Sequence, residues 1–217
     1  MTDRHAYARR HAVWAGFAAA GLFAVGNAIW GLGMPSAGTP TAEILDFYDT
    51  RGARIVIGGS ISLFAIALFV LFAAAVRQVL DQAEAGDPWI ATAFAGAVLT
   101  AAAGISAESL NVVAATRSLD GELDEPLAQA LFEISQNFGA TAFGLGIAIF
   151  ATATGVAGLR SGALTPWRSW LVLITGIVLF TPLASINVVP GALLIFIALT
   201  IAVDLRQRPA ADSSRVG

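Results

Sequence analysis

The sequence predicts an all-α membrane protein, a single bundle of six transmembrane helices with the N-terminus and the C-terminus in the cytoplasm. Three observations support this prediction. Hydrophobic residues make up 57% of the 217-residue chain and charged residues only 12%, and the mean hydropathy is +0.75. A water-soluble domain of this size cannot bury so much apolar surface. Long apolar runs also recur along the chain, and arginine gathers in alternate connections between them.

A helix needs about 20 mostly apolar residues to cross a hydrocarbon core about 30 Å thick. Six segments meet this requirement, at residues 12–34, 54–77, 89–115, 127–158, 167–185 and 190–204. The last two separate at Pro182 and at "NVVPG" (187–191), since proline restricts the residue before it and glycine permits a turn. We therefore divide the chain into a cytoplasmic segment 1–11, one transmembrane domain 12–205 and a cytoplasmic tail 206–217.

The distribution of arginine tests this arrangement, because cytoplasmic loops near helix ends carry the excess of basic residues. All 12 basic residues are arginine, and six spans place only Arg51, Arg54 and Arg117 on the outer side. Tryptophan falls near both predicted membrane boundaries, as in an interfacial aromatic belt. Trp30 lies at the outer boundary, and the residues at the inner boundary are Trp14, Trp89, Trp167 and Trp170.

The outer connection between the first two spans contains a short amphipathic helix, "TPTAEILDFYD" (39–49). Thr39 can cap this helix and Pro40 suits its first position. One face is apolar and the opposite face is acidic. The apolar stripe consists of Ile44, Leu45, Phe47 and Tyr48, and the acidic face consists of Glu43, Asp46 and Asp49. We expect this helix to lie on the outer membrane surface.

Polar residues gather in the outer half of the predicted bundle. Glu108 and Glu133 are acidic residues that lie within spans, away from the helix ends. At about 1.5 Å per residue, Glu108 lies roughly 28 Å from the inner boundary and Glu133 roughly 10 Å from the outer end of its span. The same counting brings three asparagines to this layer, and a glutamine precedes the last of them. These amides are Asn27, Asn111, Gln136 and Asn137.

Helical periodicity predicts that both glutamates face the interior of the bundle. Glu108 shares a face with the small residues Gly104, Ala101 and Ala97. Glu133 shares one with Gln129, Asn137, Ala140 and Gly144, whereas Phe132, Ile134 and Phe138 point elsewhere. We therefore predict a ligand- or ion-binding pocket in the outer half of the membrane. Its residues are Glu108, Glu133, Asn27, Asn111, Gln136 and Asn137.

A charged carboxylate costs about 2.5–3.5 kcal/mol at the centre of a membrane. Three arrangements offset this cost: protonation of the carboxyl group, pairing with Arg54 or Arg117 from the outer rim, or a bound cation. Each arrangement implies a different function. The amides alone are explained equally well by hydrogen bonds between helices.

The sequence excludes several other kinds of site. The chain has no cysteine, hence no disulfide, thiolate catalyst or cysteine-ligated metal. Its two histidines, His5 and His11, lie before the first span and are too few for a zinc centre. No Walker, GxGxxG, HExxH or Gly-x-Ser-x-Gly motif occurs, so we expect no cofactor and no metal. The net charge of -3 gives no argument for a nucleic-acid partner.

Two stretches, "EILDFYDTRGARI" at 43–55 and "GLRSGALTPWRSWL" at 158–171, resemble segments of small polytopic actinobacterial membrane proteins that are grouped as domains of unknown function. The resemblance implies six spans and a location in a bacterial plasma membrane. It implies no activity and no catalytic residues.

Three hypotheses for the function follow. The first is a bundle, surrounded by membrane lipids, that binds or transports a small polar or cationic ligand or a proton through the predicted pocket. The second is a structural or regulatory subunit, in a homo-oligomer or with another membrane protein, in which the polar layer only sets helix register. The third is an intramembrane enzyme with two carboxylates as acid and base. The absence of catalytic motifs favours the first two.

Overall fold

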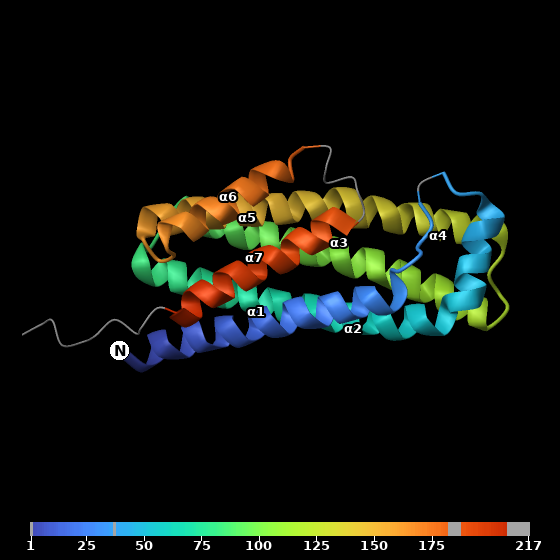
Figure 1. The fold of residues 1–217 in the computed structure, drawn as a ribbon, viewed down its shortest axis with the longest axis horizontal. Coiled ribbons are helices and arrows are strands. Elements are labelled where there is room, and N and C mark those ends of the chain that lie inside the picture. The colour runs from blue at the N-terminus through green and yellow to red at the C-terminus, as the bar shows by residue number, and fades with distance from the viewer. Residues whose placement is uncertain (1, 37, 182–187, 208–217) are drawn as a thin grey trace, which may run out of the picture.

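The computed structural model describes residues 2–36, 38–181 and 188–207, and all regular elements in these ranges are helical. In chain order they are α1 (Thr2–Trp30), α2 (Thr41–Ala83), α3 (Pro88–Leu119), α4 (Glu125–Asn137), the π-helix η1 (Phe138–Ala142), α5 (Phe143–Ser161), α6 (Pro166–Val178) and α7 (Val188–Gln207). The elements α4, η1 and α5 follow one another without a break as a single rod (Figure 1). The predicted all-α bundle is confirmed.

Five helical segments are long and apolar enough to cross a membrane: Arg10–Trp30, Thr41–Ala83, Pro88–Leu119, Glu125–Ser161 and Val189–Gln207. They correspond to five of the six predicted spans. The helix expected over 167–185 is wrong beyond Val178, where α6 ends after 13 residues, a length of about 20 Å. Proline disfavours helical geometry at the residue before it, and Pro182 follows closely. Pro182 and Asn187 lie outside the described residues, and the rest of the predicted break at 187–191 is wrong, because residues 188–191 form the first turn of α7.

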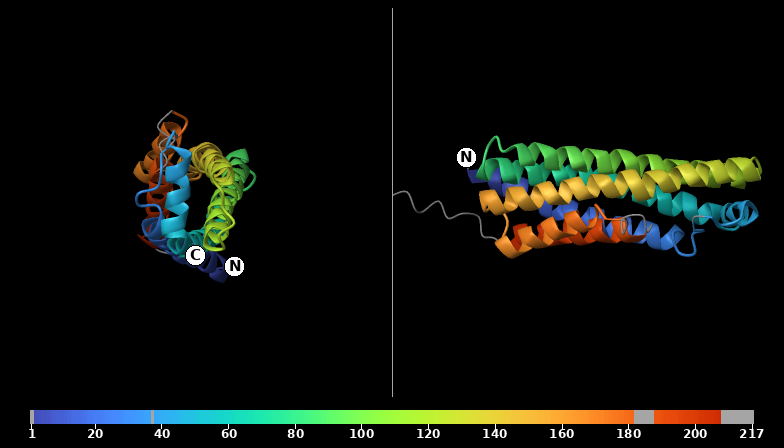
Figure 2. Two further views of the ribbon diagram at one scale, coloured as in Figure 1. Left: turned by 90° about the vertical axis from the view of Figure 1, so that its right-hand side faces the viewer. Right: turned by 90° about the horizontal axis from the view of Figure 1, so that it is seen from above.

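Consecutive helices pack as antiparallel neighbours, and α7 returns to pack against α1 (Figures 1 and 2). The bundle therefore has two distinct ends. The N-terminal end holds the start of α1, the turns 84–87 and 162–165, and the last turn of α7. The α4 end holds the turn 120–124 and the described residues of the connection between α1 and α2, which are 31–36 and 38–40. Since α1 starts and α7 stops at the same end, the described helices agree with two termini on one side.

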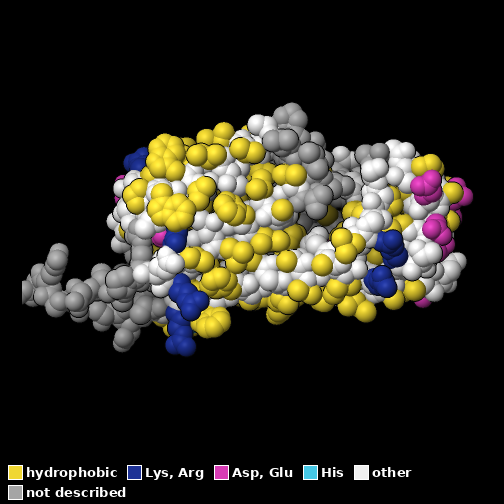
Figure 3. All heavy atoms as spheres, in the orientation of Figure 1, with side chains coloured by type: hydrophobic (Ala, Val, Ile, Leu, Met, Phe, Trp, Pro, Cys, Tyr) yellow, Lys and Arg dark blue, Asp and Glu magenta, His cyan; other side chains and the backbone are white. Residues whose placement is uncertain are grey.

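On the face of the bundle drawn in Figure 3, hydrophobic side chains cover the middle, and charged side chains gather at the two ends. At the N-terminal end four indoles are exposed, as a belt requires: Trp14, Trp89, Trp167 and Trp170. Trp30 is only 6% exposed, so its predicted place in an outer belt is wrong. Its ring packs into an apolar cluster at the α4 end.

The amphipathic stretch after Pro40 is not a separate helix, because it forms the first turns of α2. These turns, residues 41–50, are called the cap segment here. They lie across the α4 end, while the rest of α2 runs along the bundle (Figures 1 and 2). The predicted stripe is confirmed, with Ile44, Phe47 and Tyr48 buried. It faces the bundle and not a membrane surface, because it packs against Trp30 and Phe132.

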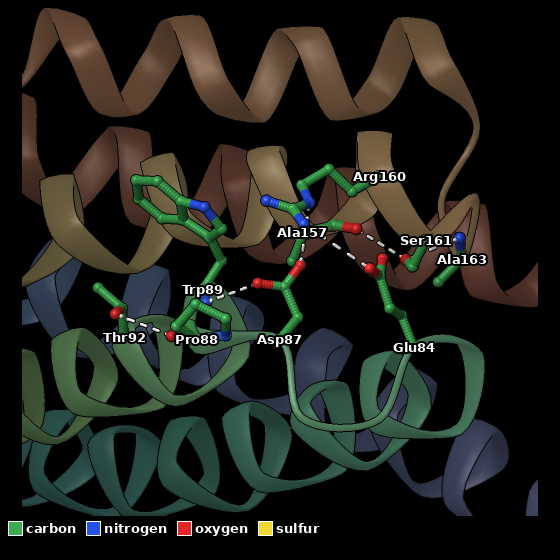
Figure 4. A network of polar contacts seen from close by, with 9 residues as sticks. All are labelled: Glu84, Asp87, Pro88, Trp89, Thr92, Ala157, Arg160, Ser161 and Ala163. Atoms are coloured by element: carbon green, nitrogen blue, oxygen red, sulfur yellow. Dashed lines mark hydrogen bonds and ion pairs between the residues drawn. The ribbon is translucent and has the colours of Figure 1, made fainter.

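Ionic contacts tie the helices together at the N-terminal end. Asp87 accepts a hydrogen bond from the Trp89 N–H (3.0 Å) at the start of α3. The same carboxylate lies 3.2 Å from Nε of Arg160 on α5, and Arg160 also reaches Glu84 at 3.8 Å (Figure 4). A second ion pair is buried between α6 and α7, where Arg168 Nη1 lies 3.1 Å from Asp204 Oδ1.

Helices α3 and α5 cross in backbone contact because each places a glycine at the crossing. A Cβ atom on Gly146 would lie 2.5 Å from the backbone nitrogen of Thr100, and one on Gly96 would lie 2.5 Å from that of Phe150. Neither contact is possible without moving a helix. Small residues are the usual means of close approach between helices in membranes.

We expect Gly146→Ala to lower the free energy of unfolding by about 1–3 kcal/mol, because the added methyl group forces α3 away from α5. The matched control is Gly21→Ala on α1, where an added Cβ meets nothing within 4 Å. The control should leave stability unchanged or raise it by up to about 1 kcal/mol. Thermal unfolding in a mild detergent measures both variants, and equal effects would contradict the crossing.

Candidate binding site

A cavity of about 100 Å³ lies between α1, α3, the α4–η1 rod and α7. Its volume is enough for a few water molecules or a small ligand. Four of the six predicted site residues line it: Asn27, Glu108, Asn111 and Gln136. The structure therefore brings together polar residues from α1, α3 and α4, as the sequence predicted.

Glu108 is the acidic group of the cavity. The residue is 6% exposed, and its Oε2 atom has no hydrogen-bond partner among the described residues. Gly59 leaves space beside this atom, since a Cβ there would lie 3.5 Å from Oε2. No ion pair joins Glu108 to a described arginine, and Arg117 instead approaches Glu122 at 3.9 Å. Pairing with Arg54 or Arg117 is thus not the arrangement found, which leaves protonation or a bound cation.

Two further unpartnered polar atoms belong to residues that line the same cavity. Trp30 Nε1 and Ser135 Oγ are buried and make no hydrogen bond to a described residue. A buried polar group without a partner costs about 1–3 kcal/mol, and such groups are few in folded proteins. A donor, a hydroxyl and a carboxylate left unpaired around one cavity are the pattern expected where a ligand or water completes the hydrogen bonds.

The amides of the cavity are partly engaged with the protein. Asn111 Oδ1 accepts a hydrogen bond from the Tyr48 hydroxyl at 2.9 Å, which joins the cap segment to the cavity wall. Asn27 Nδ2 donates to the Phe23 carbonyl of its own helix at 2.9 Å. In each asparagine one amide atom is held by the protein, Nδ2 in Asn27 and Oδ1 in Asn111. The other amide atom of each side chain is left for a ligand or water.

Glu133 and Asn137 do not line the cavity, and the prediction that Glu133 faces the interior is wrong. Both residues are exposed. Glu133 Oε1 accepts a hydrogen bond from Gln129 Nε2 at 2.8 Å, and Asn137 Nδ2 donates to the Glu133 carbonyl at 2.9 Å. The buried face of α4 instead carries Phe132 and Ser135.

The error has a physical reason in the packing of the rod. The face that Glu133 shares with Gly144 is covered in α5, where Gly155 packs against Leu173 of α6. Helix α6 stops at Val178, and α4 packs against α2 and α3. A small residue such as Gly144 on this face of α5 therefore did not indicate that Glu133, on the same face of α4, is buried.

The π-helix η1 adjoins the cavity and has no clear signal in the sequence. Gly139 of η1 and Phe143, the first residue of α5, both line the cavity. A π-turn adds one residue to a helical turn, and such turns are frequent at functional sites. The polar stretch "EISQNFG" (133–139) does mark the region, but helical periodicity alone does not reveal the wider turn.

The depth of the cavity follows from α7. Gly191, near the start of this helix, lines the cavity, and Asp204, near its end, pairs with Arg168 at the N-terminal end. A helix of 20 residues is about 30 Å long, the thickness of a hydrocarbon core. Gly191 lies 16 residues before Gln207, the last residue of α7, which is about 24 Å along the helix. The cavity therefore lies in the half of the bundle away from the N-terminal end, as the distance of roughly 28 Å counted along α3 to Glu108 also indicates.

No family model, curated protein or solved structure matches the chain. The geometry of the cavity is therefore the basis for assigning a function.

We expect Tyr48→Phe to lower the free energy of unfolding by about 1–3 kcal/mol, since it leaves the buried Asn111 Oδ1 without a donor. The control is Tyr7→Phe, because Tyr7 is the other tyrosine of the chain and its ring is exposed. Thermal unfolding of the two variants compares the same chemical change at both sites. A Tyr48→Phe variant as stable as the control would contradict a structural role for the hydrogen bond.

Proposed function

We propose that this chain is a multi-pass protein of a bacterial plasma membrane that binds a small cationic or polar ligand at Glu108. The observation that carries the proposal is the buried, unpartnered Oε2 atom of Glu108 beside a cavity. An ionisable residue within a membrane helix is functional by default, because its burial is costly and needs a compensating partner. Binding alone is the minimal function, and transport of the same ligand is its extension.

The composition of the cavity favours a small ammonium ion. Glu108 supplies a carboxylate, and Asn27 and Asn111 supply amide groups. Trp30 lines the same cavity, and an indole is the aromatic ring that attracts cations most strongly. A volume of about 100 Å³ suits a ligand of a few heavy atoms.

The distribution of charge supports an N-terminal end in the cytoplasm. Five described arginines lie at this end, namely Arg10, Arg77, Arg160, Arg168 and Arg206. Arg51, Arg54 and Arg117 lie toward the α4 end. Under the rule that basic residues stay inside, the cavity then lies in the outer half of the hydrocarbon core. The exposed Glu133 lies beyond the cavity, toward the α4 end, where water can solvate its charge.

The binding proposal is tested by thermal stability of the purified protein with a panel of alkali cations and small amines. A ligand at 100 times its dissociation constant should stabilise the wild type by about 2.7 kcal/mol. Glu108→Gln should lose this effect, because the amide keeps the size of the side chain and removes its charge. Glu133→Gln is the matched control, outside the cavity, and should respond as the wild type does. Equal responses of all three proteins to each compound would overturn the proposal.

The orientation is tested with single cysteines, which the chain permits because it has none of its own. Glu122→Cys lies in the exposed turn at the α4 end, and Gln82→Cys is exposed at the N-terminal end. In intact cells an impermeant maleimide should label Glu122→Cys, and it should label Gln82→Cys only after permeabilisation. The reverse pattern would invert the orientation, and labelling of both in intact cells would contradict a membrane-spanning bundle.

A further inference from the structure

An open groove of about 1040 Å³ lies between α1 and α2 near the N-terminal end, away from the Glu108 cavity. Its polar part carries Arg10 and His11 from α1, and Arg77 and Asp81 from α2. Its apolar part consists of alanine and leucine side chains from both helices, among them Ala15, Ala18, Leu68, Leu71, Ala74 and Ala75. The groove is therefore amphipathic along its length.

On both helices the charged residues lie nearer the N-terminal end of the bundle and the apolar residues lie deeper, although the two chain directions are opposite. On α1 the chain passes from Arg10 to Ala18 toward the middle of the bundle, and on α2 it passes from Arg77 back to Leu71 in that direction. At about 1.5 Å per residue, the apolar part lies roughly 9–12 Å deeper than the arginines. This is the order of headgroup and acyl chain in one leaflet.

The polar part carries an excess of positive charge. Arg10 makes no ion pair with a described residue. Arg77 Nε lies 3.5 Å from Asp81 Oδ2, an exposed pair within one helix, and such pairs contribute little. The Arg77 guanidinium also lies over the Phe94 ring, 5.2 Å from its centroid. This contact orients the group, and the Nη atoms, which the Asp81 contact does not use, remain as donors for a phosphate.

The apolar part has the shape that an acyl chain requires. Alanine on both helices leaves a trough, and Leu71, which is 61% exposed, forms part of its wall. Two exposed aromatic residues, Tyr7 and Trp14, lie beside the arginines, as amphipathic rings do at the level of lipid headgroups.

We propose that the groove binds one anionic phospholipid of the cytoplasmic leaflet, with its phosphate between Arg10 and Arg77 and an acyl chain along Ala18 and Leu71. Two arginines against one carboxylate favour a lipid with net negative charge over a zwitterionic one. The proposal rests on the membrane orientation proposed above and does not depend on Glu108. Failure of one binding experiment therefore leaves the other intact.

The test measures thermal stabilisation of the full chain in a non-ionic detergent as phosphatidylglycerol is added. Phosphatidylcholine with the same acyl chains and inorganic phosphate are titrated in parallel. We expect phosphatidylglycerol to act at the lowest concentration and inorganic phosphate to have no effect. Arg10→Gln and Arg77→Gln should each raise the required lipid concentration roughly five-fold, because each basic residue contributes to attraction of the anionic headgroup.

Two control variants test whether the groove itself holds the lipid. Arg206→Gln removes an exposed arginine from the same end but outside the groove, and it should change the required concentration less than about two-fold. Ala18→Phe keeps the charge and fills the trough at an exposed position, so it should weaken lipid binding. This variant also tests the groove if an arginine variant does not fold.

Three results would overturn the proposal. A loss in Arg206→Gln equal to that in Arg77→Gln would show a general surface potential. Stabilisation by inorganic phosphate, together with no effect of Ala18→Phe, would show a site for a free anion. A change to a dimer on removal of lipid, measured by light scattering, would show that a second copy of the chain covers the groove.

Discussion

The structure depends first on the need to hydrogen-bond every backbone amide of a strongly apolar chain within its own helix. In hydrocarbon an unsatisfied N–H or C=O group costs several kcal/mol, and the result is a set of long helices, of which α2 has 43 residues. Helices in lipid gain little from the hydrophobic effect when they associate, so close packing determines their arrangement. The crossing of Gly96 and Gly146 sets the position of α3 against α5, and α3 carries Glu108.

The fold was largely predictable because its main determinants are local. Apolar length predicted six spans, five of which correspond to described helices long and apolar enough to cross a membrane. Arginine placement agreed with termini at one end, and the apolar stripe of the cap segment was visible in the sequence. The partners of these elements were less predictable. From the sequence alone, the stripe of the cap segment could pack against a membrane surface or against the bundle. The structure shows that it packs against Phe132 and Trp30 of the bundle. Helix α6 ended early because the sequence beyond it contains proline. Hydropathy averaged over a long segment does not detect the effect of a single proline.

The depth of the candidate site was predictable from the sequence, but the direction in which each side chain points was not. Counting residues along a helix placed Asn27, Glu108, Asn111 and Gln136 at one level, and these four residues line one cavity. Facing depends on which neighbours cover each part of a helix, and that is a tertiary property. Glu133 was misplaced because α6 covers α5 and not α4, and Trp30 because an indole near a helix end also fits an apolar cluster. The unpartnered atoms of Trp30 and Ser135 became visible only in the packed structure.

The buried carboxylates at the two levels of the bundle differ in whether an arginine lies beside them, and this contrast argues that the cavity is more than imperfect packing. At the N-terminal end Asp87 and Asp204 each lie beside an arginine. At the cavity, no described arginine lies beside the Glu108 carboxylate, although one apolar substitution there could remove the cost of its burial. An apolar cluster that includes Tyr48 and Phe132 lies between the cavity and the α4 end, and the Tyr48 hydroxyl binds Asn111 in the cavity wall. The cap segment is thus joined directly to the site, so a ligand that approaches from the α4 end must displace or pass this cluster. Because Tyr48 of the cap segment binds Asn111 in the cavity wall, any movement of the cap segment also changes the wall of the cavity.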